Sequence, residues 1–300
     1  MKPKILVILG QTATGKSDVA VDLGKKFKGE IISADSRQIY RGLDIGTGKV
    51  TKKEMKGVSH YLLDVASPKK QFSVVDFQRL ALKKINEIIK RKKIPIIAGG
   101  TGFYIDAIVK ENSFPEVPPD HALRKKLATK SAITNLATLK KLDSRRAKNI
   151  DPKNNIRIIR AIEIARALGK VPHLDTPRPS KYDSLKIGLK PHQEILKAKI
   201  KYRLLKRLDM GMIEEVKKLH KKRLSWKRLN ELGLEYRYVA LYLQKKISRE
   251  EMIDELSRAI WRYAKRQDTW FKRDKNIRWF DPSKKSDLRE IGNLVEKFLK

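Results

Sequence analysis

The sequence predicts an α/β protein with a parallel sheet, because short apolar runs alternate with helical periodicity near its N-terminus. The apolar runs are Lys4–Leu9, Glu30–Ser33 and Ile94–Ala98. Their length and composition are typical of strands that are buried on both faces. The alternation of strand and helix then indicates a doubly wound core.

The first apolar run leads directly into GQTATGKS, Gly10–Ser17, which matches the phosphate-binding pattern G-x-x-x-x-G-K-[ST]. A helix is expected to follow from about Lys16 to Phe27. In such a loop the backbone N–H groups and the helix N-terminus bind an anion. Lys16 adds a positive charge, and Ser17 is placed to hold Mg²⁺. The strand before the loop and the helix after it predict a P-loop NTPase-like core.

Further polar segments follow the other two strands. Ala34–Gln38 comes after the second strand, and Gly99–Gly102 comes after the third. A capping box at Ser73–Asp76 opens the amphipathic helix between them, which is predicted to reach Lys93. Ligands of doubly wound folds bind at the carboxyl ends of the strands, so we expect these segments to converge with the phosphate loop on one crevice.

Two proline-rich joints, Phe114–Pro119 and His173–Asp183, separate a different region from the core. Only helical periodicity occurs between them, and Asp151-Pro152 resembles the start of a helix. We therefore predict a helical insertion over residues 112–182, between two parts of the core at 1–111 and 183–300.

The C-terminal part is predicted to be helical. A returning strand is expected at Lys186–Leu189, and helical periodicity continues from Pro191 onward. A capping box at Ser248–Glu251 predicts a long helix that runs to about Phe271.

The charge balance points to a polyanionic partner. The chain has 70 Lys and Arg against 34 Asp and Glu, a formal net charge of +36. The excess is concentrated outside the phosphate loop, with 14 basic against 3 acidic residues in 121–170 and 15 against 4 in 186–228. Neutralisation of phosphates supplies most of the non-specific affinity of proteins for nucleic acid, so the charge indicates a nucleic-acid partner. The alternative explanation of the charge is a general enrichment in lysine.

The composition also excludes several classes of protein. The absence of cysteine rules out a disulfide framework, a Cys-ligated zinc site and a catalytic thiol, and it fits a reducing, cytoplasmic location. No apolar run has the length of a membrane span, and residues 1–9 lack a signal-peptide pattern. We expect no association with a membrane.

The residues after the strands do not match an ATPase or GTPase. Ile94–Ala98 ends in Gly-Gly, where those enzymes carry a magnesium-binding Asp. The acid at a strand end is Asp35, which could be a magnesium ligand, a general base or a helix cap, and its spacing does not choose among them. His60 is interpreted as a structural histidine. The stripe Arg258, Arg262 and Arg266 is either solvated or faces phosphates.

Six motifs, taken in order, are similar to those of the tRNA dimethylallyltransferase family: GQTATGKS, SADSRQIYRGLDIGTGK, GVSHYLLD, GGTGFYI, DPKNNIRIIRAIEI and KRQDTWF. The resemblance covers nearly the whole chain. It implies Mg²⁺-dependent transfer of a dimethylallyl group from dimethylallyl diphosphate to N6 of the adenosine 3′-adjacent to the anticodon. The implied partners are dimethylallyl diphosphate and a tRNA anticodon stem-loop, and we expect a monomer.

The resemblance also implies roles for individual residues. Asp35 is the expected general base, Thr101 lies next to the reacting centre, and Arg203 lies near the diphosphate. The expected donor-binding residues are Gly10, Gln11, Thr12, Ala13, Thr14, Gly15, Lys16 and Ser17, with Ser17 also holding the metal. The expected tRNA contacts are Asp35, Ser36, Arg37, Gln38, Thr101, Arg124, Ile156, Arg157, Ile158, Ile159 and Arg160.

The chain departs from the family pattern at one turn and in the insertion, which is short, so we expect fewer outer tRNA contacts there. The family usually has Gly-Tyr-x-Glu before its last helices, whereas this chain has Gly233-Leu234-Glu235-Tyr236. A tRNA contact expected at Asn230–Glu235 is correspondingly less well supported. Two other functions stay open from the residues alone: a P-loop phosphotransferase (a kinase) with a small acceptor, and an RNA-binding protein with an inactive loop. Within the family, prenylation of free AMP is also conceivable, but the basic insertion favours a polymer.

Overall fold

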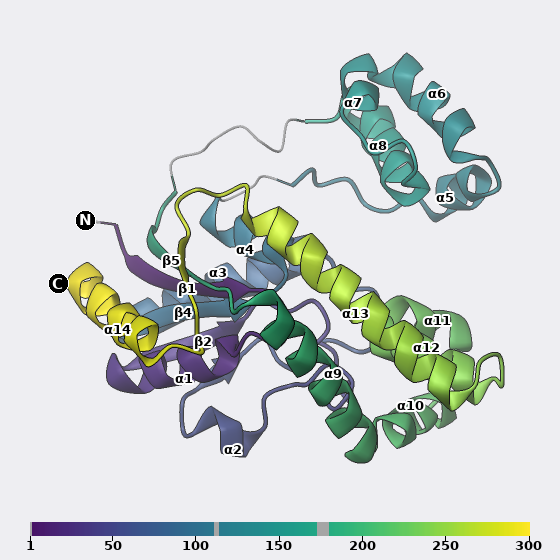
Figure 1. Ribbon diagram of the computed structural model, residues 1–300. Helices are drawn as coiled ribbons and strands as arrows, with labels where there is room; N and C mark the ends of the chain where they lie inside the picture. The colour runs from purple at the N-terminus through teal and green to yellow at the C-terminus, as the bar shows by residue number, and fades with distance from the viewer. Residues whose placement is uncertain (1, 111–113, 173–179) are drawn as a thin grey trace. The chain divides into compact units, whose positions relative to one another are not determined.

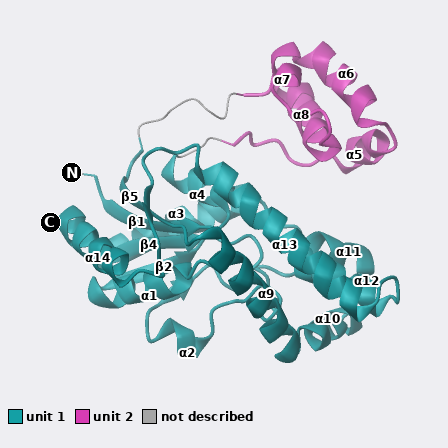
Figure 2. Ribbon diagram, viewed as in Figure 1, with its two compact units in different colours: residues 1–111, 179–300 teal, residues 112–178 magenta. Residues whose placement is uncertain are grey.

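The computed structural model describes residues 2–110, 114–172 and 180–300, and its contacts divide the chain into two compact units. Unit 1 comprises residues 1–111 and 179–300, and unit 2 comprises residues 112–178 (Figure 2). Unit 2 is therefore inserted in the sequence between two parts of unit 1. The role in binding tRNA that we assign to the insertion stays a prediction.

Unit 1 is built on a six-stranded sheet in which every pairing is parallel (Figure 1). The strand order is β3-β2-β4-β1-β5-β6. The strands are β1 (Lys4–Gly10), β2 (Gly29–Ser33), β3 (His60–Tyr61), β4 (Ile94–Gly99), β5 (Asp183–Leu189) and β6 (Arg278–Phe280). This confirms the predicted parallel α/β core, and β1 joins the two parts of the unit because it lies between β4 and β5.

The two edge strands were not predicted. β3 has two residues and β6 has three, so neither is long enough to show a periodic pattern. The prediction that the chain is only helical after Pro191 is wrong at β6, which pairs with β5 through Ile187 and Arg278.

Side chains of β1 alternate between two hydrophobic layers. Ile5, Val7 and Leu9 pack with α3 (Val74–Lys90) and α4 (Gly102–Val109). Leu6 and Ile8 pack on the other face with α1 (Lys16–Lys26) and α14 (Lys285–Leu299). A central parallel strand is covered on both faces, which explains why β1 reads as a continuous apolar run.

A third hydrophobic cluster connects the C-terminal helices to the segment that follows β2. The helices are α9 (Gln193–Asp209), α10 (Met212–Lys221), α11 (Trp226–Leu232), α12 (Leu234–Leu243) and α13 (Arg249–Phe271). Ile39, Tyr40 and Leu43 are buried among them. The same segment leads to the short helix α2 (Lys52–Met55). In the described part of the chain, no helix is both long and apolar enough to cross a membrane.

The capping boxes predicted at Ser73 and Ser248 are both present. The first opens α3, which ends at Lys90 rather than Lys93, because Lys92 has a left-handed backbone conformation with φ of 56°.

Unit 2 consists of α5 (His121–Ala128), α6 (Ala132–Leu142), α7 (Ser144–Lys148) and α8 (Asn155–Leu168) around its own hydrophobic core. Asp151 does not cap α8 as predicted. The cap is Asn154, whose side chain accepts a hydrogen bond from the backbone N–H of Arg157.

Phe77 tests the packing of α3 on the sheet. Its side chain is fully buried and stacks on Tyr104, with ring centroids 4.1 Å apart. Phe77→Ala is expected to lower the free energy of unfolding by about 3–5 kcal/mol, because it leaves a cavity in the core. Urea denaturation measures this change. Val75→Ala, on an exposed part of the same helix, is the control and should change stability by less than about 0.5 kcal/mol.

Candidate active site

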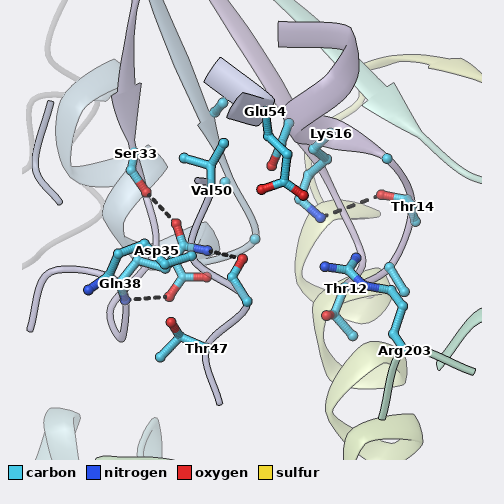
Figure 3. Close-up of a pocket in the computed structure, with 18 of the residues that line it drawn as sticks. Thr12, Thr14, Lys16, Ser33, Asp35, Gln38, Thr47, Val50, Glu54 and Arg203 are labelled. Atoms are coloured by element: carbon cyan, nitrogen blue, oxygen red, sulfur yellow. Dashed lines mark hydrogen bonds between the residues drawn. The ribbon is translucent and has the colours of Figure 1, made fainter. Parts of the chain in front are cut away.

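The carboxyl ends of the strands border a cavity of about 590 Å³, as the sequence predicts (Figure 3). The phosphate loop, the segment after β2 and Gly99–Gly100 at the end of β4 all line it. Of the predicted site residues, those that line the cavity are Thr12, Ala13, Thr14, Gly15, Lys16, Ser17, Asp35, Gln38 and Arg203.

Five other predicted residues of unit 1 are not part of the cavity wall. Thr101 lies just behind it, where its hydroxyl oxygen accepts a hydrogen bond from the backbone N–H of Ser36 at 3.2 Å. Arg37 follows in the same turn. Gly10 ends β1, and the side chain of Gln11 is buried against α13, where it donates to the carbonyl of Ala264 at 3.1 Å.

The phosphate loop has the backbone of an anion site. Gly15 immediately precedes α1 in a left-handed conformation with φ of 83°, and its position carries no side-chain cap. The first N–H groups of α1 therefore lack the side-chain acceptor that most helices provide. A phosphate at this end of the helix would accept these hydrogen bonds and interact favourably with the helix dipole.

Gln267 on α13 holds this loop in place, and the sequence analysis did not identify it. Its Oε1 accepts from the N–H of Thr12 at 2.8 Å, and its Nε2 donates to the carbonyl of Gly100 at 2.8 Å. One amide thus joins the loops that follow β1 and β4. Glycine at position 100 makes room for this bridge, because a Cβ there would lie 2.3 Å from Nε2 of Gln267 and would displace the amide. The motif KRQDTWF contains Gln267, but nothing local in it reveals these contacts.

Two cations lie in the cavity without a carboxylate bound to either of them. The Lys16 ammonium donates to the carbonyl of Gln11 and to Thr14 Oγ1. Arg203 makes no hydrogen bond or ion pair with the described residues. Burial and, to a smaller extent, the Arg203 charge lower the pKa of Lys16 to about 7, although the Asp35 charge opposes both effects. Burial also lowers the pKa of Arg203, as does neighbouring Arg207. An anion bound between them would relieve this cost.

The two carboxylate oxygens of Asp35 have different surroundings. Oδ1 accepts from the backbone N–H groups of Arg37 at 2.8 Å and Gln38 at 3.4 Å, which holds a turn rather than the start of a helix. Within the described residues Oδ2 has no hydrogen-bond partner, so it can accept a proton from a ligand. Burial raises the pKa of nearby Tyr263 to about 12, and the Asp35 charge contributes to that increase.

The site suits a magnesium ion that arrives with phosphate oxygens. Among the described residues there is no cluster of three or more His, Cys, Asp or Glu side chains that could hold a metal ion. Mg²⁺ needs no such cluster, because it is usually bound through one or two protein oxygens together with substrate phosphates and water. The Ser17 hydroxyl, next to Lys16 on the cavity wall, fits that pattern.

The predicted residues of unit 2 divide into buried and exposed groups. Arg124 and Arg160 both bind the buried carboxylate of Glu163, at 2.7 Å and 3.1 Å. Ile158 and Ile159 belong to the hydrophobic core, which leaves their side chains little surface for RNA. The exposed members are Ile156, with 83% of its surface accessible, and Arg157.

Two further interpretations can be compared with the structure. The ring of His60 lies 2.8 Å from the carbonyl of Val58, the local contact expected of a structural histidine, although His60 also lines the cavity. Arg258, Arg262 and Arg266 are exposed on α13. Their exposure is compatible with both a solvated face and a phosphate-binding face.

Comparisons with known proteins identify the family of this chain. Residues 38–274 match the family model described as IPP transferase. This chain belongs to the IPP transferase family. A tRNA dimethylallyltransferase 2 of Treponema denticola is 47% identical, with 93% of this chain and 96% of that protein covered. A tRNA dimethylallyltransferase of Pelotomaculum thermopropionicum is 39% identical, with 99% and 96% covered.

Solved structures lead to the same family. The full-length tRNA isopentenylpyrophosphate transferase of Bacillus halodurans has a TM-score of 0.75 and 36% identity, with 99% of this chain and 96% of that chain covered. A eukaryotic dimethylallyltransferase is 24% identical with a TM-score of 0.80, which shows a shared fold. Membership of the IPP transferase family does not favour the phosphotransferase alternative.

Lys16 should take up a proton when a diphosphate binds. At pH 8 a group with a pKa of about 7 is mostly neutral, and a bound anion favours its charged form. Binding of a diphosphate at pH 8 should therefore take up about one proton, and the affinity for the diphosphate should fall as pH rises above 7. Calorimetry in buffers of different ionisation enthalpy measures the uptake. Lys16→Arg stays charged and should lose it, so equal uptake in both proteins contradicts the prediction.

Arg124 and Arg157 should respond differently to substitution. Arg124→Gln is expected to destabilise unit 2 by about 3 kcal/mol, because the buried carboxylate of Glu163 loses a partner. Arg157→Gln should leave stability unchanged. It should reduce the slope of log affinity against log salt concentration for an anticodon stem-loop by about one. Urea denaturation and binding titrations at several salt concentrations separate the two effects. A loss of stability in Arg157→Gln would contradict this assignment.

Proposed function

We propose that this protein transfers a dimethylallyl group from dimethylallyl diphosphate to N6 of the adenosine 3′-adjacent to the anticodon in tRNA. The observation that carries the proposal is a single cavity lined by an anion-binding loop, two unpaired cations and a carboxylate with a free oxygen. Membership of the IPP transferase family and the names of its relatives support the same reaction.

Each part of the cavity has a task in this reaction. The adenine N6 attacks C1 of the donor, the N6–C1 bond forms, and the C1–O bond to the diphosphate breaks. Asp35 takes the proton that N6 loses, through the oxygen that the turn leaves free. The diphosphate leaves as an anion, and the N–H groups of α1, Lys16 and Arg203 stabilise its charge. Ser17 and the diphosphate oxygens would hold Mg²⁺, which supplies further positive charge to the leaving group.

The acceptor reaches the cavity as part of a polymer. A base must leave its stack to enter a buried site, and this is least costly where it is already unpaired, as in an anticodon loop. The net charge of +36 provides the long-range attraction for RNA phosphates. Exposed cations of unit 2 such as Arg157 are suited to phosphate contacts.

Transfer of radiolabel tests the proposal directly. The protein is incubated with labelled dimethylallyl diphosphate and an anticodon stem-loop that carries adenosine or guanosine at the target position, with and without Mg²⁺. Label should enter the adenosine stem-loop only, and only when Mg²⁺ is present. Rapid ATP hydrolysis without label transfer would instead support a phosphotransferase.

Asp35→Asn tests the general base. Asparagine keeps the Oδ1 acceptor that holds the turn but cannot take a proton, so kcat should fall about 10²–10⁴-fold. Donor affinity should stay within about twofold, because Asp35 makes no bond to the phosphate loop. Single-turnover kinetics measures the chemical step. The matched control is Asp22→Asn. Asp22 is an exposed residue of α1 whose carboxylate pairs with Lys56, and the variant should react at the wild-type rate.

A further inference from the structure

The wall of the cavity opposite the phosphate loop is an irregular segment, Asp44–Gly48, here called the DIGTG loop. Asp44, Ile45, Thr47 and Gly48 line the cavity. The loop contains no helix or strand, and its own backbone bonds close only a turn, from the N–H of Gly48 to the carbonyl of Ile45 at 3.0 Å and from the N–H of Lys49 to the carbonyl of Asp44 at 2.9 Å. Lys49 Nζ pairs with the Asp44 carboxylate at 2.6 Å, and groups from the C-terminal helices bind the N–H and carbonyl groups that the turn leaves free.

Glu215 on α10 binds the N–H side of the DIGTG loop. Its Oε2 accepts from the backbone N–H groups of Asp44 at 2.9 Å and Ile45 at 2.7 Å, and its Oε1 accepts from Gly46 at 3.0 Å. The hydroxyl of Tyr236 on α12 donates to the same Oε1 at 2.7 Å. Four donors thus converge on one carboxylate, and hydrogen bonds to a charged acceptor are stronger than neutral ones.

Arg207 on α9 holds the opposite side of the loop. Its guanidinium donates to the carbonyl of Gly46 at 3.2 Å and pairs with Glu235 at 3.4 Å. The loop is packed closely against these groups. A Cβ at Gly46 would lie 2.8 Å from the ring of Tyr236, and one at Gly48 would lie 2.0 Å from Arg207.

The DIGTG loop is also connected to the turn that carries Asp35. The side chain of Gln38 donates to the carbonyl of Gly48 at 3.3 Å and accepts from Ser33 at 3.2 Å. The backbone N–H of Gln38 is one of the two that Asp35 Oδ1 binds. A displacement of the loop would therefore change the shape of the donor cavity and disturb the residue next to the proposed base.

We propose that Glu215 and Tyr236 are positioning residues that hold the DIGTG loop as the wall of the donor cavity. This inference rests on the proposed function only in naming the cavity's occupant as a prenyl diphosphate. It also gives a role to two adjacent residues at the start of α12, because Glu235 binds Arg207 and Tyr236 binds Glu215, the two groups that hold the loop.

Glu215→Gln is the primary test. Whichever way the new amide turns, its NH₂ group faces at least one backbone N–H donor, so the loop loses acceptors without losing volume. Hydrogen exchange at Asp44, Ile45 and Gly46 should become about tenfold faster, and affinity for inorganic pyrophosphate with Mg²⁺ should fall about tenfold. Donor KM should rise similarly, while the affinity for an anticodon stem-loop stays unchanged.

Two further variants separate positioning from general destabilisation. Glu214→Gln removes the same charge from the neighbouring residue of α10, where the carboxylate is exposed and pairs with Lys217 at 2.7 Å, and it should behave as wild type. Tyr236→Phe keeps the ring against Gly46 but removes the hydroxyl. It should weaken pyrophosphate binding by about threefold and keeps the test available if Glu215→Gln does not fold.

The possible outcomes distinguish this inference from the proposed function. Faster exchange in the loop together with weaker pyrophosphate binding supports the positioning role, even if the wild-type protein transfers no prenyl group. Unchanged exchange, or faster exchange with unchanged pyrophosphate and donor affinity, overturns it. Equal effects of Glu214→Gln and Glu215→Gln also overturn it, because a general charge effect would then explain the loss.

Discussion

The concentration of positive charge at the carboxyl end of β1 is the constraint on which the site depends. The same cavity is bordered by the N-terminus of α1, Lys16 and Arg203. Burial lowers the pKa of both side chains and so disfavours their charged forms. Such an arrangement is unfavourable in the free protein and favourable once an anion is bound. The surrounding contacts, above all the Gln267 bridge between two loops, hold this arrangement in place without the anion.

The C-terminal helices are part of the active site rather than an addition to the sheet. They supply Arg203 and Gln267 to the cavity, and Glu215 to the loop that forms its opposite wall. The hydrophobic cluster that buries Ile39 and Leu43 attaches the same helices to the segment after β2. The sheet therefore supplies the anion site, while the helices determine the shape of the space around it.

The formal net charge of this protein is not a count of the cations that are free to bind a partner. In unit 2, Arg124 and Arg160 pair with the buried carboxylate of Glu163. Their charges are therefore already used within that unit. Exposed cations such as Arg157 remain for a partner. A large formal charge thus indicates a polyanionic partner, because long-range attraction depends on the sum, but it does not identify the contacting residues.

The sequence by itself determined the parallel core, the phosphate loop and the position of Asp35 at a strand end. These depend on local patterns, namely continuous apolar runs, glycine spacing and capping residues. Only the tertiary structure decided which oxygen of Asp35 is free, which arginines are already paired, and that Gln267 and Glu215 support the cavity. Each of these facts follows from the three-dimensional positions of side chains, often between residues far apart in the chain, and no local pattern in a single sequence records such contacts.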